Sequence, residues 1–310
     1  MLVTPHIFLD TTVFDQNSHN YSSTAFQRLA ALVNGNRIKI YITNITQREI
    51  ESHIKKHVEA AQLSIKAVLN GHRFLKSIRH PSIEAVNNGL DVEEVTNALL
   101  KQFRDWLSEM SVTVLPIGRV SVEEIFERYF ESSPPFESKE KKKAEFPDAF
   151  ALAALEGWCQ EHGAKMYVIS GDGGMSAACE ASRTLKSIKS LPEFLDLLTQ
   201  GEKLAELANR LFETHKPEVW RKIKLAVDHL ILSSYEPHIE VEYTHVTAVK
   251  LLKHYLLEVE KTRAVFDVNV KVNYTASVTK HNYAVGMMMG MPERLAMPKS
   301  ERPSQARAVM

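Results

Sequence analysis

The sequence is poor in cysteine: only two of its 310 residues are Cys, Cys159 and Cys179. Their spacing matches neither a zinc-binding motif nor a disulfide framework, so we expect a reducing, cytoplasmic location. There is no run of about 18 apolar residues, the length that a membrane-spanning helix requires. The first residues also lack a basic segment followed by an apolar stretch, which is the pattern of a signal peptide. The sequence therefore predicts a cytoplasmic protein with no membrane partner.

An excess of either charge is absent as well. Lys and Arg together number 38, as do Asp and Glu, so the formal net charge is zero. Net charge therefore gives no indication of a nucleic-acid partner, although a local basic patch could serve one. What is present is the composition of a folded protein, with 44% hydrophobic and 25% charged residues. The length is enough for one large domain or two small ones.

The first 190 residues alternate between short apolar runs and longer segments with helical periodicity. The expected strands are 6–9, 38–42, 112–115, 166–169 and 185–188, and the expected helices are 22–34, 44–78, 92–110, 121–131 and 145–162. Alternation of this kind favours an α/β fold of three layers, in which helices cover both faces of a central, mainly parallel sheet.

The pattern changes after residue 190. Residues 190–235 have helical character, whereas 238–243 and 266–274 alternate apolar and polar residues with a period of two. That period indicates antiparallel strands with one buried face. From Met287 onward no periodicity remains. We therefore expect three regions: a domain at 1–198 with a helical insertion at about 52–110, a small α+β appendage at 199–285, and a disordered tail at 286–310.

Four acidic residues stand at the ends of expected elements: Asp10, Glu49, Asp148 and Asp172. Asp10 and Asp172 follow apolar strands, Glu49 comes soon after another strand, and Asp148 begins an apolar helix. The carboxyl ends of parallel strands meet at the sheet edge where ligands bind, so these acids are expected to converge. Converging carboxylates repel one another unless a cation joins them. Because Mg²⁺ and Mn²⁺ prefer oxygen ligands, the pattern predicts a site for one or two such ions.

Each acid also has an ordinary structural interpretation. Asp10 could cap the turn that follows it, Asp172 could form an Asx-turn, and Asp148 could be an acid in the first turn of a helix. Glu49 could be an exposed helix residue. The joint placement of the four, and above all of the two that follow apolar strands, favours a shared site.

Other sites fit the sequence less well. A phosphatase of the haloacid dehalogenase type needs a second Asp two residues after the first, where this chain has Thr12. A Rossmann dinucleotide site needs a glycine-rich turn after the first strand, and none follows Asp10. His53 and His57 have the helical spacing of zinc ligands, but the sequence places no third ligand near them.

Four segments, taken in order, resemble a PIN domain. They are Phe8-Leu9-Asp10-Thr11-Thr12-Val13-Phe14, Ile42-Thr43-Asn44-Ile45-Thr46-Gln47-Arg48-Glu49-Ile50, Phe146-Pro147-Asp148-Ala149 and Ile169-Ser170-Gly171-Asp172-Gly173. The resemblance covers roughly residues 5–190 and is greatest to larger bacterial PIN-like proteins with a helical insertion and a C-terminal extension. It implies a metal-dependent nuclease, usually acting on RNA.

The resemblance also implies roles for single residues. The catalytic, metal-binding acids would be Asp10, Glu49, Asp148 and Asp172. Thr11 or Thr12 would orient Asp10, and Ser170 would add a polar contact. The basic run Lys141, Lys142 and Lys143 lies just before Asp148 and is either a solvated loop or a grip on substrate phosphates.

We therefore expect a Mg²⁺- or Mn²⁺-dependent phosphodiesterase, an endoribonuclease ahead of a deoxyribonuclease, in bacterial defence or toxin-type growth control. The long segment between Glu49 and Asp148 and the appendage are both absent from small toxin-type members, which leaves host defence and RNA processing equally open. The alternative is a catalytically inactive binding module that recruits RNA or protein through the appendage. A homodimer or an inhibitory partner protein is compatible with the sequence.

Overall fold

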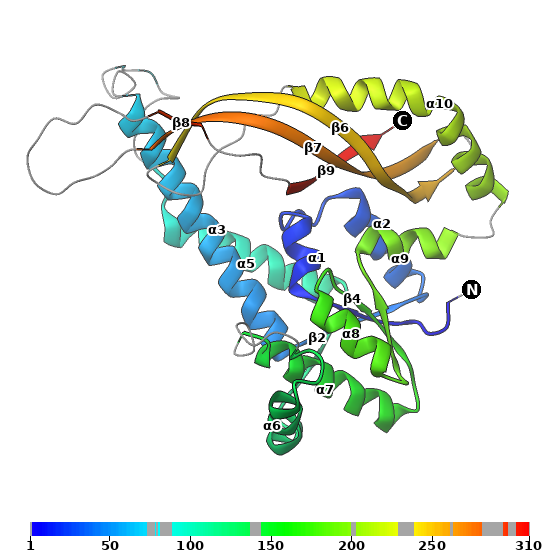
Figure 1. Ribbon diagram of the computed structural model, residues 1–310. Coiled ribbons are helices and arrows are strands. Elements are labelled where there is room, and N and C mark those ends of the chain that lie inside the picture. Colours follow the sequence, from blue (N-terminus) through cyan, green and yellow to red (C-terminus); the bar gives the residue numbers. More distant parts are fainter. Residues whose placement is uncertain are drawn as a thin grey trace, which may run out of the picture. The chain divides into compact units, whose positions relative to one another are not determined.

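The computed structural model describes residues 2–72, 78, 80, 89–136, 144–199, 203–228, 239–260, 263–280, 294–296 and 302–309 (Figure 1). The chain forms two compact units. The first comprises Met1–Lys56 with Thr96–Gln200, and the second comprises His57–Val95 with Gly201–Met310.

The first unit is built on a five-stranded parallel sheet in the order β3-β2-β1-β4-β5. Its strands are β1 (His6–Leu9), β2 (Lys39–Thr43), β3 (Thr113–Leu115), β4 (Met166–Ile169) and β5 (Leu185–Ile188). From β1 the chain first proceeds to one side, through β2 and β3, and later to the other, through β4 and β5. The strand order thus reverses between β1 and β4, the position where open α/β sheets bind ligands.

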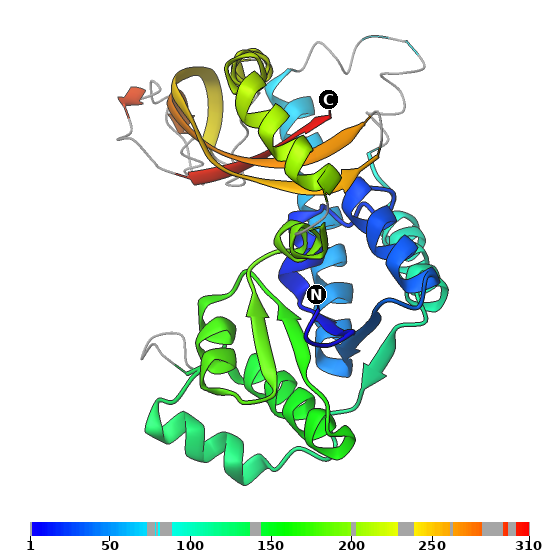
Figure 2. The same ribbon diagram turned by 90° about the vertical axis from the view of Figure 1, so that its right-hand side faces the viewer.

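Helices cover both sides of this sheet (Figure 2). The helices are α1 (Thr11–Gln16), α2 (Thr24–Asn34), α3 (Asn44–Gly71), α5 (Val92–Glu109), α6 (Val122–Glu131), α7 (Phe146–His162), α8 (Gly173–Ala181) and α9 (Leu191–Thr199). Phe8 packs in one core cluster with residues of α7 and α8. Its strand neighbours Ile7 and Leu9 are also fully buried, and since side chains alternate along a strand they face the opposite layer. The expected three-layer α/β fold is therefore confirmed.

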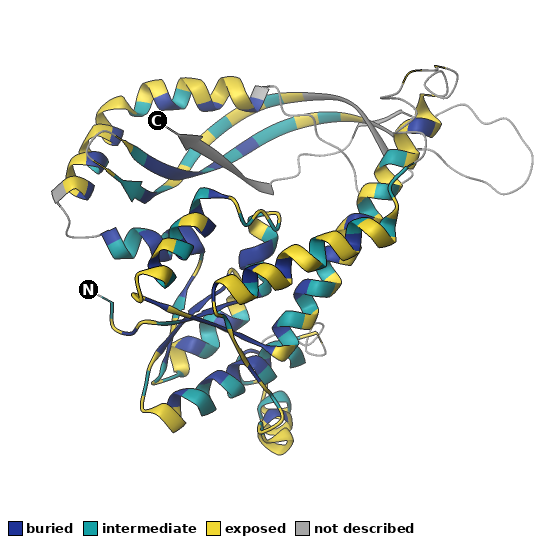
Figure 3. Cartoon of the chain, turned by 180° about the vertical axis from the view of Figure 1, so that it is seen from behind, coloured by how far each residue is buried: buried dark blue, intermediate teal, exposed yellow. Residues whose placement is uncertain are grey.

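The buried strands are visible in Figure 3, where the centre of the sheet is dark blue. All four residues of β4 and three of the four residues of β1 are buried. Strands covered on both faces read as continuous apolar runs, which is why their positions could be predicted closely. None of the helices in the described part of the chain is long and apolar enough to cross a membrane.

Two short helices go beyond the prediction, which placed only turns at these points. Helix α1 begins directly after Asp10, and α8 begins directly after Asp172. In both cases the aspartate is the N-cap, and its carboxylate accepts a backbone N–H of the first turn. The structural roles considered for these two acids are therefore real, and they coexist with the placement of both at one sheet edge.

The second unit carries an antiparallel hairpin, as the period-two pattern predicts. Its strands are β6 (Ile239–Val259) and β7 (Ala264–Lys280), and the helix α10 (Lys203–Asp228) lies along the hairpin (Figure 1). Phe212 and Ile223 of α10 share a core cluster with Val268 and Val270 of β7. Two further strands, β8 (Arg294–Ala296) and β9 (Arg302–Val309), pair with β7 within the segment that the sequence analysis expects to be a tail.

Candidate metal centre

Asp10 is buried and held by four hydrogen bonds. The residue is only 4% exposed. Oδ2 accepts from the hydroxyl of Thr12 at 2.7 Å, from that of Ser170 at 2.8 Å, and from the backbone N–H of Thr12 at 3.4 Å. Oδ1 accepts from the hydroxyl of Thr11 at 3.2 Å. These donors stabilise a buried carboxylate and fix its orientation.

Strand pairing brings Asp10 and Asp172 together. Leu9 pairs with Ile169, so the residues that follow these two strands, Asp10 and Ser170, lie next to each other. The hydroxyl of Ser170 accepts the backbone N–H of Asp172 at 3.0 Å while it donates to Asp10. One serine therefore links the two acids. The carboxylate of Asp172 is exposed, apart from its bond to the N–H of Met175 at 2.9 Å.

Glu49 and Asp148 reach the same edge of the sheet from helices. Glu49 lies in the second turn of α3, which follows β2, and Asp148 lies in the first turn of α7. Because α7 leads back to the start of β4, its first turn stands at the carboxyl edge. Both side chains are half-buried. The structure thus brings all four predicted acids into one region.

Electrostatics reflect this convergence. Burial, together with the negative charges of Asp10, Asp172 and Glu49, raises the pKa of Asp148 to about 8. Burial and the charge of Asp10 also raise the pKa of Glu49. Like charges this close disfavour a fully ionised cluster, so without a cation Asp148 keeps a proton at neutral pH. A divalent cation would reverse that preference by compensating the negative charge.

The donor chemistry fits hard divalent ions. The four acids offer only carboxylate oxygens, the ligand type that Mg²⁺ and Mn²⁺ prefer. The hydrogen bonds from Thr12 and Ser170 to Asp10 are of the kind that orient metal ligands from outside the coordination shell.

Sequence reasoning missed a histidine pair beside the acids. Asp15, on α1, accepts a hydrogen bond from Nδ1 of His53 at 2.7 Å and forms an ion pair with Nε2 of His19 at 3.2 Å. Burial alone would raise the pKa of Asp15, but the bonds from His19 and His53 outweigh it and lower that pKa. The sequence signals one of these two contacts, because Asp15 and His19 are four residues apart.

The lysines that the sequence suggests as phosphate contacts lie outside the residues that the structure describes. Lys141, Lys142 and Lys143 belong to the segment 137–143, and the description ends at residue 136 and resumes at 144. The role of these lysines stays a prediction.

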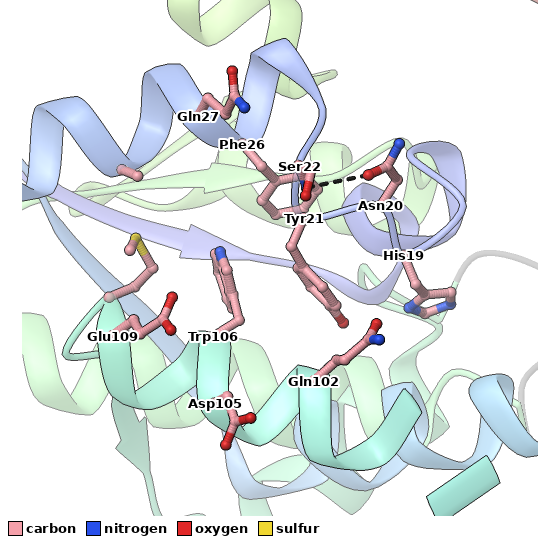
Figure 4. Close-up of a pocket in the computed structure, with 12 residues that line it drawn as sticks. His19, Asn20, Tyr21, Ser22, Phe26, Gln27, Gln102, Asp105, Trp106 and Glu109 are labelled. Atoms are coloured by element: carbon pink, nitrogen blue, oxygen red, sulfur yellow. Dashed lines mark hydrogen bonds between the residues drawn. The ribbon is translucent and has the colours of Figure 1, made fainter. Parts of the chain in front are cut away.

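A separate cavity of about 470 Å³ lies in the first unit (Figure 4). It is bordered by the segment after α1, by α2 and by α5, and none of the four acids is among its described lining residues. Tyr21 stacks on Trp106 in its wall, with ring centroids 5.5 Å apart. Trp106 packs edge-on with both Phe14 and Phe26, and Phe14 and Phe26 form a tilted pair, so these rings hold α1, α2 and α5 together.

Comparison with known proteins supports the resemblance drawn from the motifs. No curated protein and no solved structure matches the sequence significantly. A family model described as "PIN domain" matches residues 7–175, which is more than half of the chain and contains all four acids. With its parallel five-stranded sheet and additional C-terminal region, the chain therefore belongs to the PIN domain family.

Proposed function

We propose that the protein is a metal-dependent nuclease that hydrolyses phosphodiester bonds, and that its substrate is RNA cut at internal positions. The observation that carries the proposal is the convergence of Asp10, Glu49, Asp148 and Asp172 at the switch point of the sheet, where burial and the charges of the other three acids raise the pKa of Asp148. Membership of the PIN domain family, a family of nucleases, supports the same activity.

In this proposal the four acids hold one or two Mg²⁺ or Mn²⁺ ions. Such an ion, when bound, supplies a water of lowered pKa and charge stabilisation at the phosphate. Asp10 is the fixed member of the set, because its hydrogen bonds to Thr11, Thr12 and Ser170 leave it little freedom. Asp148 is the adjustable member: it carries a proton in the free protein and releases it as the cation binds.

The proposal extends to the substrate, the phosphate contacts and the biological role. RNA is placed ahead of DNA on the family resemblance, and Lys141, Lys142 and Lys143 are proposed to contact phosphates near Asp148. A role in bacterial defence or growth control is proposed on the same resemblance. A homodimer or an inhibitory partner protein remains compatible with it.

The test is a cleavage assay with labelled single-stranded RNA in Mn²⁺, Mg²⁺ or EDTA. The wild type is compared with an Asp10→Asn/Asp148→Asn double variant and with Asp105→Asn, an exposed helix aspartate paired with Lys101. We expect metal-dependent cleavage by the wild type and by Asp105→Asn, and none by the double variant. If the folded wild type cleaves neither RNA nor DNA with either metal, the binding-module alternative gains the support that the nuclease loses.

A further inference from the structure

Helix α6 presents two parallel rows of side chains to the surface. Val122, Phe126 and Phe130 follow one another at intervals of four residues and are 56%, 44% and 75% exposed. Residues four apart lie on one face of a helix, so these three form a continuous apolar row. A single exposed apolar side chain is ordinary on a protein surface, but three such side chains in a row form a patch.

The apolar row is not the side of α6 that holds the helix in the fold. That task belongs to Ile125, which is fully buried in a cluster with Phe136 and Ala149, and to Tyr129, which stacks on Phe146 with centroids 5.1 Å apart. Phe126 also packs against Phe146 in a tilted arrangement, with ring centroids 5.3 Å apart. The inner face of α6 is thus packed on the start of α7, and Val122 and Phe130 project beyond that packing.

An acidic row runs alongside the apolar row. Glu123, Glu127 and Glu131 are each one residue further along the helix than the apolar residues, and all three are exposed. Arg128, the basic residue of this helix, is engaged with Glu156 of α7 at 3.1 Å. The exposed surface of α6 is therefore an apolar ridge with a ridge of negative charge at its side.

We propose that this surface, the α6 ridge (Val122, Phe126, Phe130 with Glu123, Glu127, Glu131), is a docking site for a basic amphipathic helix of a partner protein. Such a helix carries apolar residues at intervals of three and four, with Lys or Arg beside them. Its apolar residues cover the exposed phenyl rings, and its cations pair with the glutamate row.

Charge decides between this partner and a nucleic acid. Exposed aromatic rings also stack on bases, but single-stranded nucleic acids are held by a basic groove that follows their phosphates. Three exposed glutamates beside the rings would repel those phosphates. The occupant that complements both rows is a segment that is both apolar and basic.

Binding at the α6 ridge would occur near the start of α7. Phe146, against which Phe126 and Tyr129 pack, precedes Asp148 by two residues on α7. A partner bound on α6 therefore lies beside the start of the helix that carries Asp148. The docking surface itself does not depend on the proposed nuclease activity.

The test uses two synthetic helical peptides with the same leucine spacing, one with lysine and one with glutamate at the flanking positions. Binding of each to the full chain is measured by fluorescence anisotropy at low and high salt. We expect the wild type to prefer the leucine–lysine peptide by at least about ten-fold, with the preference weakening as salt rises. Glu127→Lys/Glu131→Lys should reverse the preference, and Phe126→Ser/Phe130→Ser should lose both peptides.

Controls separate the ridge from the other acids of the molecule. Glu109→Lys/Glu180→Lys changes two exposed glutamates on α5 and α8 and should keep the wild-type preference. If Glu127→Lys/Glu131→Lys and Glu109→Lys/Glu180→Lys show the same peptide preference, the peptide is held elsewhere and the proposal is wrong. The proposal is also overturned if the wild type binds a single-stranded oligonucleotide and Phe126→Ser/Phe130→Ser does not. A wild-type dimer in sedimentation that these changes convert to a monomer would overturn it as well.

Discussion

The hydroxyl of Ser170 lies 2.8 Å from Oδ2 of Asp10 and 3.0 Å from the backbone nitrogen of Asp172. It donates to the first and accepts from the second, so one side chain, itself 1% exposed, ties together the residues that follow β1 and β4. In the proposed metal centre, Ser170 is a positioning residue for two ligands at once.

Ser170→Ala is therefore expected to weaken metal binding without removing a ligand. Oδ2 of Asp10 would keep its bond to Thr12 but lose one of its two hydroxyl donors, and the N–H of Asp172 would lose its acceptor. Loss of such an outer hydrogen bond typically costs about 10- to 100-fold in metal affinity or activity. Titration of Mn²⁺ by calorimetry measures the change.

The matched control is Ser176→Ala. Its hydroxyl bonds to that of Ser187 at 3.0 Å and touches neither acid in the described contacts. We expect this variant to bind Mn²⁺ as the wild type does. Equal affinities for all three proteins would show that Ser170 does not position the ligands.

The raised pKa of Asp148 predicts an unusual dependence of stability on pH in the absence of metal. A carboxyl whose pKa is about 8 when folded, but ordinary when unfolded, binds its proton more tightly in the folded state. Its contribution to stability is thus complete below the unfolded pKa of about 4 and is lost as pH rises through about 8. The raised pKa of Glu49 acts in the same direction.

Urea unfolding in EDTA between about pH 5 and pH 8 tests this expectation. The free energy of unfolding of the wild type should fall across this range, and the slope should be clearly smaller for Asp148→Asn, which has no proton to lose. The same slope in both proteins would mean that Asp148 ionises normally and that the carboxylates do not crowd one another.

Metal addition should reverse the loss at high pH. A ligand that binds only the folded state stabilises it by about 2.7 kcal/mol at 100 times its dissociation constant. We expect Mn²⁺ to raise the unfolding temperature of the wild type near pH 8, and EDTA to return it to the metal-free value. Asp10→Asn/Asp148→Asn should show little response, whereas Asp105→Asn should respond fully. A full response in the double variant would place the ion elsewhere.

The strands were the most predictable part of this fold. The expected strand 166–169 is the same as β4, and 38–42 differs from β2 by one residue at each end. β4 is apolar along its whole length, and β2 is apolar in its centre, Ile40–Ile42, because the sheet is covered on two faces. Helix α1 was not predictable in the same way, since six residues hold too little periodicity and its start depends on the cap that Asp10 provides.

The convergence of the four acids was predictable from the sequence, but the network of hydrogen bonds and charges around them was not. The placement of Asp10 and Asp172 after apolar strands is visible in the sequence, because a lone acid at the end of an apolar run indicates a specific role. The contact between His53 and Asp15 joins residues 38 positions apart, and only the fold brings α1 and α3 together. Sequence spacing can pair His53 only with residues on its own helix, so it does not reveal a partner on another helix.

His53→Gln tests whether that missed contact matters to the metal centre. Glutamine can still donate a hydrogen bond to Asp15, but it cannot carry the positive charge of a protonated histidine. That charge lowers the pKa of Glu49, against the effects of burial and of Asp10. Without it the pKa of Glu49 should rise further, so protons should compete with the cation up to a higher pH.

The expected result is a shift in the pH dependence of Mn²⁺ affinity. Wild-type affinity should increase with pH as Glu49 and Asp148 lose their protons, and in His53→Gln the same increase should occur at higher pH. His162→Gln is the control, because His162 stacks on Trp158 at the far end of α7 from Asp148. Since a merely structural role of His53 would lower affinity equally at every pH, a uniform decrease would assign it to packing, and a displaced profile would assign it to the charge balance of the acids.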